Sequence, residues 1–411
     1  MKILWFSVTP SMYAAYNNGH NGGGWISSLE RLVRTVPEID LGIAFEYPAC
    51  CFKENYEGVS YYPINIWNSL NRKCIKYFSL VKAEEKYLIP RCLKIIEDFK
   101  PDIIHVFGSE NCYGLLTKYT DIPIIIHMQG SLPSYYNARF PITVNFKDLL
   151  FSKSLSLSKK IFEFRNLHTF REQAEREKKI LKHTKFFFGR THWDRSITRV
   201  YNPNSQYFYC SEVLRDSFYV GKKWSVKKRK KIVIVSTIST PLYKGLDVVL
   251  KTAKILKNEC RFNFVWKVIG VNDARFIESQ YGILANEVSV ELLGCIPEKR
   301  VEAELRNADF YVHPSYIDNS PNSVCEAQIL GVPVICCNVG GLSSLVDDGK
   351  TGFLVPANDP IKIVDIIIEN FMDVSKLSMI SQQEIQEAEK RHFKLKILSD
   401  LLNGHRAILK M

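Results

Sequence analysis

Two acidic residues, Asp318 and Glu326, stand eight positions apart in the segment HPSYIDNSPNSVCEAQILGVPV, which begins at His313. The pattern predicts a buried strand that ends at His313, a loop that holds Asp318, and a helix that begins near Glu326 and ends near Gly331. Ionised carboxylates are strong, charge-assisted acceptors for hydroxyl groups. Two of them beside one strand end could hold two parts of a ligand that is rich in hydroxyls.

The start of that predicted helix adds a second kind of contact. Its first backbone N–H groups, around Asn322, Ser323 and Val324, have no partner within the helix and can meet an anion. Carboxylates that accept hydroxyl groups and backbone amides that bind a phosphate together favour a phosphorylated sugar as ligand. A simpler interpretation stays open, in which Asp318 and Glu326 are a surface acid and a residue that serves the helix start.

Three further segments accompany this pair in a fixed order. They are the tripeptide Tyr243-Lys244-Gly245, the loop LGCI with Gly294 and Cys295, and the stretch GGLSSLVDDGKTGFLV, which begins at Gly340. Together with the Asp-x7-Glu spacing they resemble the E-x7-E region of glycosyltransferase family 4, a large family of retaining enzymes with the GT-B fold. The resemblance spans most of residues 232–355 and extends more loosely into the first half of the chain.

The resemblance implies a role for each matching residue. Glu326 would bind the ribose of a nucleotide-sugar donor, and Asp318, which replaces the first Glu of the pattern, would contact the sugar. Lys244 would bind the diphosphate, and the backbone of Gly294 and Cys295 would meet the base. Asp318 is shorter than the Glu it replaces by one methylene, which puts its reach in question.

The first half of the chain carries two further candidates. Gly23 and Gly24 follow a predicted strand and precede a predicted helix, and backbone can approach a ligand closely where Cβ is absent. They resemble the family loop that closes over the diphosphate and the acceptor, although a flexible turn is the alternative. His127 ends another predicted strand and resembles the family His near the sugar, whereas His313 is interpreted as structural.

One position departs from the family pattern. Family members carry an Arg six or seven residues before the Lys, but Thr237 and Ile238 stand there in this sequence. Charge on a leaving diphosphate needs fixed donors, each worth about 3 kcal/mol in comparable sites. Arg190, at a predicted strand end facing the cleft, is the candidate replacement, and a structural ion pair is the equally open alternative.

The elements that position these residues alternate strand and helix. Continuous apolar runs predict strands at 2–8, 41–45, 103–107, 124–127 and 186–188, then at 232–235, 264–269, 288–292, 310–313 and 334–337. We therefore expect an α/β protein of the GT-B class, with two Rossmann-like, doubly wound domains facing across a cleft. The expected domains are 1–220 for the acceptor and 221–389 for the donor, with a C-terminal helix at about 390–411 packing back on the first. The whole C-terminal segment, 381–411, is predicted to be helical.

Residues 145–182 are predicted to be mostly helical. The first part, FKDLLFSKSLSLSKKIFEF, mixes Leu and Phe with Lys and Ser. It could form a basic amphipathic surface for a membrane or for a lipid-linked acceptor. The alternative is a helix that packs on its own domain.

Composition sets the remaining bounds. The chain has 411 residues and a formal net charge of +12, which favours anionic partners such as nucleotide phosphates or an anionic membrane; nothing resembles a nucleic-acid module. The 11 Cys show no C-x-x-C spacing, which favours a reducing cytoplasm. The N-terminus shows no signal peptide, and no apolar run approaches about 20 residues, so we expect a cytoplasmic protein, at most peripheral at the inner membrane face.

These features predict a metal-independent, retaining hexosyltransferase. It would need no cofactor, and it would move a sugar from a nucleotide-sugar to a saccharide or lipid-linked saccharide acceptor in cell-surface polysaccharide assembly. The sequence has no Asp-x-Asp motif and no His cluster, so no metal is expected. Two rivals stay open: a sugar-nucleotide epimerase of the same fold, and a catalytically silent, donor-binding partner of another transferase.

Overall fold

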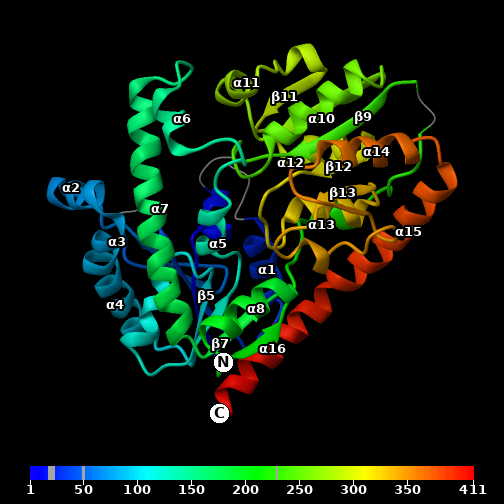
Figure 1. Ribbon diagram of the computed structural model, residues 1–411. Coiled ribbons are helices and arrows are strands. Elements are labelled where there is room, and N and C mark those ends of the chain that lie inside the picture. Colours follow the sequence, from blue (N-terminus) through cyan, green and yellow to red (C-terminus); the bar gives the residue numbers. More distant parts are fainter. Residues whose placement is uncertain (17–23, 49–50, 228–229) are drawn as a thin grey trace. The chain divides into compact units, whose positions relative to one another are not determined.

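The computed structural model describes residues 1–411 apart from 17–23, 49–50 and 228–229, so Gly23 lies outside the described residues (Figure 1). The chain forms two compact units. The first comprises Met1–Tyr136, Asn166–Val213 and His392–Met411, and the second comprises Asn137–Arg165 and Leu214–Arg391. The changeover after Val213 lies near the boundary predicted after residue 220. Residues 137–165, assigned to the first domain from the sequence, group with the second unit.

The first unit is built on an eight-stranded sheet in the order β3-β4-β2-β1-β5-β6-β7-β8. Its strands are β1 (Lys2–Phe6), β2 (Asp40–Glu46), β3 (Glu54–Tyr56), β4 (Val59–Ile64), β5 (Ile103–Phe107), β6 (Ile124–His127), β7 (Phe186–Gly189) and β8 (Gln206–Tyr209). All neighbours pair in parallel except β3, which is antiparallel to β4. The order reverses direction between β1 and β5, as in a doubly wound fold.

Alternation along β1 shows why both faces of this sheet are covered. Ile3 and Trp5 belong to one apolar core, which also contains residues of α1 (Gly24–Val33) and α16 (Lys394–Leu409). Leu4 and Phe6 belong to another, which contains residues of α4 (Ile89–Phe99) and α7 (Leu157–His183). Successive side chains of a strand point to opposite faces, so a continuous apolar strand needs helices on both sides.

The remaining short elements of the first unit connect these layers. They are η1 (Ser11–Tyr16), α2 (Leu70–Phe78), α3 (Leu80–Ala83), the π-helical turn η2 (Glu84–Leu88), η3 (Cys112–Lys118), α5 (Leu132–Asn137) and α8 (His192–Tyr201).

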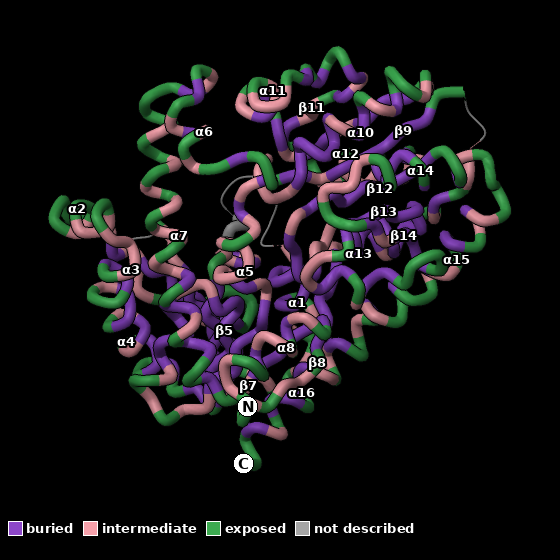
Figure 2. Tube along the Cα trace, in the orientation of Figure 1, coloured by how far each residue is buried: buried purple, intermediate pink, exposed green. Residues whose placement is uncertain are grey.

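The second unit has a six-stranded, all-parallel sheet in the order β11-β10-β9-β12-β13-β14, again reversing beside its first strand. Its strands are β9 (Ile232–Thr237), β10 (Phe264–Ile269), β11 (Val290–Gly294), β12 (Phe310–His313), β13 (Val334–Cys337) and β14 (Phe353–Val355). Its helices are α6 (Phe146–Phe151), α9 (Asp216–Tyr219), α10 (Leu246–Asn258), α11 (Arg275–Tyr281), η4 (Asn286–Val288), α12 (Glu298–Asn307), α13 (Asn322–Leu330), η5 (Leu342–Ser344), α14 (Pro360–Asn370) and α15 (Val374–Arg391). The strands of both sheets are mostly buried (Figure 2).

The predicted fold class, two Rossmann-like α/β domains, is confirmed, and each predicted strand appears within a few residues of its expected position. Four strands are absent from the predicted ranges: β3, β4, β8 and β14. In β4, Pro63 pairs with Phe45 in the parallel register, although Pro usually indicates a break in a strand. The helix predicted across 381–411 is two helices, because α15 ends at Arg391 and α16 starts at Lys394.

Candidate functional site

The predicted donor-binding residues follow the carboxyl ends of adjacent strands in the second sheet. Lys244 lies between β9 and α10, and Asp318 lies between β12 and α13. β9 and β12 are neighbours, and they are the strands between which the order reverses. In open α/β sheets, ligands bind beside the carboxyl ends of strands at this reversal point. The sheet topology therefore brings Lys244 and Asp318 to the place where such a fold binds ligands.

Asp318 is buried and held by several partners. The Lys244 ammonium forms an ion pair with its Oδ2, and His313 Nε2 lies 2.9 Å from the same atom. The second carboxylate oxygen accepts the Asn319 amide at 3.1 Å. Because the carboxylate can only accept, Nε2 of His313 is the donor. His313, interpreted as structural from the sequence, thus orients a predicted site residue.

The charges of this cluster favour an ionised Asp318. Burial raises the pKa of the carboxyl, but the Lys244 charge and the His313 hydrogen bond outweigh burial and hold the pKa well below its usual range. Burial also lowers the pKa of His313, so this ring is neutral at pH 7. The cluster at pH 7 is therefore one cation, one anion and one neutral donor.

Two glycines allow the chain to close around Asp318. Gly340 has φ +54°, and a Cβ there would lie 1.8 Å from the Asp318 carbonyl oxygen, which also accepts the Gly341 amide at 2.9 Å. Gly245 has φ +77°, and a Cβ there would lie 2.1 Å from the Pro314 carbonyl oxygen. Only glycine fits these approaches without strain. The Lys-Gly and Gly-Gly motifs are thus explained by packing against the loop that carries Asp318.

Glu326 is held by a second cation that sequence reasoning missed. Arg215 grips it with two hydrogen bonds, from Nε to Oε1 and from Nη2 to Oε2, both 2.8 Å long. Burial raises the pKa of Glu326, and Arg215 opposes this only in part, so the pKa lies above its usual value. Arg215 lies 111 positions from Glu326 in the chain, so no local pattern could have indicated the pair.

The helix predicted after Asp318 starts where expected, but one of its first backbone amides already has a hydrogen-bond acceptor. Helix α13 begins at Asn322, and its N-cap, Pro321, makes no side-chain capping bond. The amide of Val324 donates to the Pro321 carbonyl at 3.0 Å, so the expectation that it is free for a ligand was wrong. Within the described part of the chain, the amides of Asn322 and Ser323 have no hydrogen-bond acceptor. These two groups remain able to meet an anion.

The loop predicted to meet the base also lies at this edge. Gly294 ends β11 with φ +63°, and Cys295 after it is exposed. Thr237 and Ile238 stand in place of the family Arg. Thr237 ends β9 at the same edge, and Ile238, directly after it, is fully buried.

In the first unit, Arg190 follows β7 and is already engaged. Its Nη1 donates to Glu212 at 3.0 Å, its Nη2 donates to the Met128 carbonyl at 3.3 Å, and its guanidinium lies 5.0 Å from the Trp25 ring centroid. These contacts match the structural alternative for Arg190. A role in binding the diphosphate stays a prediction. Gly24 opens α1, directly before Trp25, with φ +57°.

His127 ends β6, and its ring lies inside the first unit. The ring is fully buried, packs edge-on against Trp25 at 5.0 Å, and places Nε2 3.2 Å from the Cys210 carbonyl. Burial lowers the pKa of His127 to about 3, so the ring is neutral and Nε2 is the donor. Its proposed contact with the sugar stays a prediction.

Other polar groups gather at the same edge of the first sheet. Glu177 of α7 accepts hydrogen bonds from the Ser109 hydroxyl and, at 2.6 Å, from the Leu132 amide; burial raises its pKa to about 8. In the described residues, Oε2 of Glu110, Nδ1 of His127 and Oγ of Ser131 are buried without a hydrogen-bond partner. Such atoms are costly to leave unsatisfied, so a polar ligand here would stabilise them.

Sequence reasoning missed the acids of this edge. Glu177 stands between Ala174 and Ile180 at helical spacing, on the buried face of α7, and this could have marked it as a buried acid.

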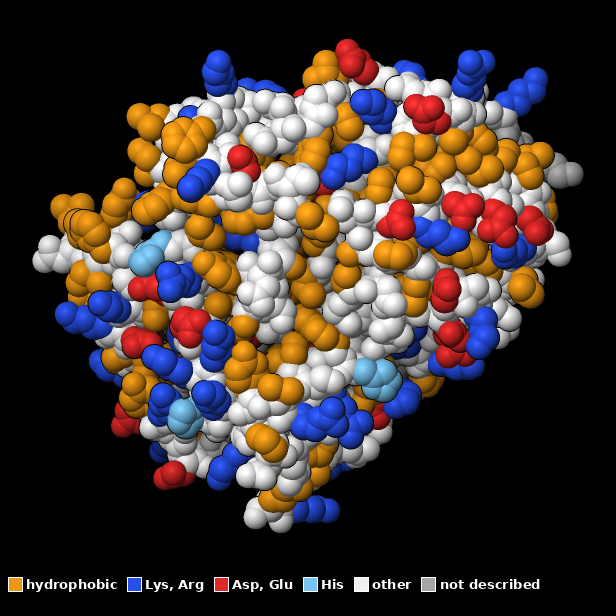
Figure 3. All heavy atoms as spheres, viewed as in Figure 1, with side chains coloured by type: hydrophobic (Ala, Val, Ile, Leu, Met, Phe, Trp, Pro, Cys, Tyr) orange, Lys and Arg blue, Asp and Glu red, His pale blue; other side chains and the backbone are white. Residues whose placement is uncertain are grey.

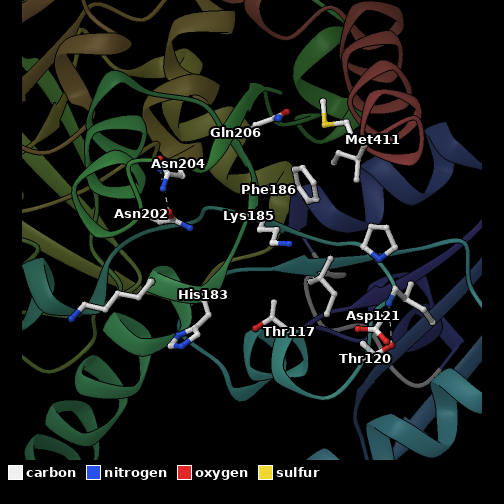
Figure 4. A pocket seen from close by; sticks show the side chains of 15 residues that line it. Thr117, Thr120, Asp121, His183, Lys185, Phe186, Asn202, Asn204, Gln206 and Met411 are labelled. Carbon is white, nitrogen blue, oxygen red and sulfur yellow. Dashed lines mark hydrogen bonds between the residues drawn. The ribbon is translucent and has the colours of Figure 1, made fainter.

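A separate cavity of about 760 Å³ lies at the opposite edge of the first sheet (Figure 4). It is lined by residues at the amino ends of β6, β7 and β8, including Ile124, Phe186 and Gln206. Its basic residues are Lys182 and His183, in the last turn of α7, and Lys185; positive charge at Lys182 stabilises the helix terminus. The cavity shares no residue with the predicted site.

The match to a known protein family falls in the second unit. Residues 221–387 match the family model for glycosyl transferases group 1, which covers most of the second unit. The chain is 31% identical over 126 residues to the putative colanic acid biosynthesis glycosyltransferase WcaL of Salmonella typhimurium. That match covers 28% of this chain and 30% of the relative, so the chain matches less than a third of the length of this curated protein.

Solved structures match over the whole chain. Sucrose-phosphate synthase from Thermosynechococcus elongatus aligns with a TM-score of 0.72 at 16% identity, over 100% of this chain and 99% of that one. Anabaena Alr3699/HepE, in complex with UDP-glucose, aligns with a TM-score of 0.63 at 12% identity, over 99% and 100%. Two doubly wound sheets and these end-to-end alignments give the chain the GT-B fold, with a glycosyl transferases group 1 match at residues 221–387 of the second unit.

Proposed function

We propose that the protein is a retaining glycosyltransferase that moves a hexose from a nucleoside-diphosphate sugar to a saccharide or lipid-linked saccharide acceptor. One observation carries the proposal: Asp318 and Glu326 stand beside the strand-reversal point of the second sheet, each paired with a cation, within a region that matches glycosyl transferases group 1. The named function of WcaL supports a role in surface-polysaccharide assembly.

The donor would bind to the second unit. Glu326 would accept hydrogen bonds from the ribose hydroxyls, with Arg215 keeping its carboxylate ionised and oriented. Asp318 would accept a sugar hydroxyl, and the donors that hold it offset its shorter side chain by fixing its position. Lys244 and the amides of Asn322 and Ser323 would face the diphosphate. The base would meet the backbone at Gly294 and Cys295.

The transfer would retain the anomeric configuration through a front-face reaction. The bond between the anomeric carbon and the departing phosphate oxygen breaks, and a bond to the acceptor oxygen forms on the same face. The acceptor proton passes to the departing phosphate oxygen. The protein supplies orientation and charge stabilisation, which are the terms that such a reaction needs most.

The acceptor would bind to the first unit. Support comes from Glu110, His127 and Ser131, whose buried unsatisfied atoms lie at the carboxyl edge of the sheet. A hydroxyl-rich acceptor could satisfy them, and Gly23 and Gly24 would cover it.

The first experiment identifies the donor. UDP-, GDP- and TDP-sugars are screened by thermal unfolding, since a ligand at about 100 times its Kd stabilises the folded state by about 2.7 kcal/mol. The screen is repeated with EDTA, and unchanged stabilisation is expected because no metal is proposed. Loss of stabilisation in EDTA would contradict metal-independent binding.

The second experiment separates transfer from its rivals. The selected donor is incubated with the protein, and release of nucleoside diphosphate is followed together with the anomeric configuration of the product by NMR. Slow nucleoside diphosphate release and a product of retained configuration are expected. An isomerised sugar would identify an epimerase, and stabilisation without any turnover would identify a silent donor-binding partner.

A further inference from the structure

Helix α2 of the first unit carries its apolar side chains outward. None of its residues, LNRKCIKYF, is buried. Leu70, Tyr77 and Phe78 are 79%, 52% and 77% exposed, and Cys74 is exposed as well. Positions 70, 74, 77 and 78 follow helical spacing and form one stripe. In a globular protein such a stripe normally faces the core.

The cationic side of α2 faces the protein instead. Arg72 donates through Nη1 to the Ile66 carbonyl at 3.1 Å, and its guanidinium lies 5.1 Å from the Tyr87 ring. Lys76 places Nζ 4.1 Å from the Trp67 ring centroid. The amphipathic helix is therefore inverted: aromatic rings contact two of its cations, Arg72 and Lys76, and its apolar stripe is exposed to solvent.

The orientation of α2 is fixed at both ends. Ser69 caps the first turn by accepting the Arg72 amide at 3.3 Å. Ser79, directly after the helix, donates to the two carboxylate oxygens of Glu172 at 3.1 and 3.0 Å. In Figure 1 the helix stands out beyond α3 and α4, and in Figure 3 hydrophobic side chains gather over it. Its apolar side chains are thus held on a projecting surface.

We propose that α2 docks the protein on an anionic lipid bilayer. Leu70, Tyr77 and Phe78 would enter the boundary between headgroups and acyl chains, where Tyr is favoured. Lys73 is exposed beside the apolar stripe and α2 carries no acid, so the outward face of the helix complements anionic headgroups. A projecting convex helix fits a deformable lipid surface. Within the described residues no helix is long and apolar enough to cross a membrane, so this contact is peripheral.

The proposal does not depend on glycosyl transfer, because it concerns lipid binding alone. A second surface, on α6 and the start of α7, also exposes apolar residues, and it serves as the rival: Phe151, Leu157 and Phe162 are exposed there. It is less basic in balance, because Asp148 and Glu163 stand among its lysines.

Vesicle co-sedimentation tests the surface directly. Full-length protein is mixed with vesicles of phosphatidylcholine alone or with phosphatidylglycerol added. We expect binding only to the anionic vesicles, weakening as salt rises. The combined variant Leu70→Ser, Tyr77→Ser, Phe78→Ser is expected to bind at least about tenfold more weakly. A matched variant, Tyr119→Ser, Val200→Ser, Tyr209→Ser, removes exposed apolar residues elsewhere in the first unit and is expected to bind like the parent.

A change of charge on α2 and the depth to which its side chains enter the bilayer provide two further measurements. Lys73→Glu is expected to weaken binding to anionic vesicles about fivefold or more, since each basic residue contributes about 1 kcal/mol at such a surface. Tyr77→Trp is expected to place a fluorophore that brominated lipids quench, whereas Tyr119→Trp is not. Donor-induced thermal stabilisation, unchanged in every variant, confirms that the variants fold.

Four outcomes would overturn the proposal. The first is equal binding to neutral and anionic vesicles, and the second is no binding to either. The third is loss of binding in the combined variant Phe151→Ser, Leu157→Ser, Phe162→Ser while the α2 variant still binds. The fourth is a parent dimer that the α2 variant converts to monomer without any change in vesicle binding, which would assign the stripe to a second copy of the chain.

Discussion

The two units use charge at their strand edges in opposite ways. In the second unit, the cations that pair with the site carboxylates remain within reach of solvent: the side chains of Lys244 and Arg215 are 14% and 22% exposed. In the first unit, Arg190 is only 4% exposed and pairs with a fully buried Glu212. A cation that keeps contact with water can exchange its partner for a ligand phosphate, whereas a sealed pair mainly holds the fold together.

This difference parallels the comparisons. The family match falls in the second unit, where the proposed function assigns the ribose and the diphosphate of the donor to charged groups. The first unit offers neutral and unsatisfied groups, which suit recognition of an acceptor by hydrogen bonds. We infer that donor chemistry is carried by charge in one unit and acceptor choice by polarity in the other.

Replacing Lys244 tests this contrast most strongly. Lys244→Met is expected to lower kcat by about 10²–10³-fold, because a fixed charge on the leaving diphosphate is lost. It also leaves Asp318 buried without its cation, so a lower free energy of unfolding is expected in urea titrations. Steady-state kinetics on the donor selected above provide the measurement.

Arg190 supplies the counterpart in the first unit. If Arg190 only holds Glu212, Arg190→Ala will reduce stability and leave kcat and donor KM unchanged, which would exclude it as the replacement for the family Arg. A fall in kcat comparable to that of Lys244→Met would break the contrast between the units.

Acid should destabilise the first unit more than the second, where Asp318 opposes the lowering of the His313 pKa by burial. Burial lowers the pKa of His127 and of His405 to about 3. The unfolded chain binds these protons below about pH 6.5 and the folded unit excludes them, so stability falls by about 1.4 kcal/mol per pH unit for each ring. Asp318, with its lowered pKa, loses its contribution only below about pH 4. Hydrogen exchange at pH 7 and 5 should show first-unit amides losing protection.

Replacing His405 alone allows the contribution of one buried ring to the pH dependence of stability to be measured. His405 packs against Phe188 and lies 3.2 Å from His105, so His405→Phe keeps an aromatic ring and removes one titrating group. The variant is expected to lose about 2 kcal/mol less stability than the parent between pH 6.5 and 5. An identical pH dependence in parent and variant would contradict the assignment.

Arg215 should set the acid limit of donor binding. Arg215→Leu removes the charge that opposes burial, so the pKa of Glu326 rises further. Because the ionised carboxylate is proposed to accept the ribose hydroxyls, donor affinity should begin to fall at a higher pH than in the parent. Calorimetric titrations across pH check the shift, and Glu326→Gln, which cannot ionise, should lose this pH dependence altogether.

The smallest effect is expected at His313. His313→Phe removes the hydrogen bond to Asp318 while Lys244 still holds it, so kcat/KM should fall only several-fold. His313→Gln, which can donate to Asp318, should restore part of the activity. Equal loss in both variants would indicate a packing role for the ring.

Local sequence patterns predicted only part of the candidate site in the second unit, for physical reasons. Asp318, Glu326 and the Gly-Gly turn lie close together in the chain, so local pattern was enough to place them. Arg215, by contrast, meets Glu326 through the folded sheet, and no local rule connects them. His313 followed the usual pattern of a strand-end residue, and only its distance to Asp318 revealed its role.

Strand β4 and the C-terminal helices show the same limit. The strand VSYYPI contains a proline, which sequence rules treat as a break, and parallel pairing with β2 overrides that local preference. The helix predicted over 381–411 is interrupted before Lys394, where the chain passes from the second unit to the first. Tertiary packing decided both cases.

The return of α16 to the first unit has a consequence for synthesis. Ile397, Leu401 and Ile408 complete the apolar core that contains Ile3 and Trp5, yet they follow the whole second unit in the chain. At about 5–20 residues per second, roughly 10–40 seconds pass between the synthesis of residue 213 and that of residue 397. During that interval the core around β1 lacks the side chains of α16, so the first unit begins before the second unit and is completed after it.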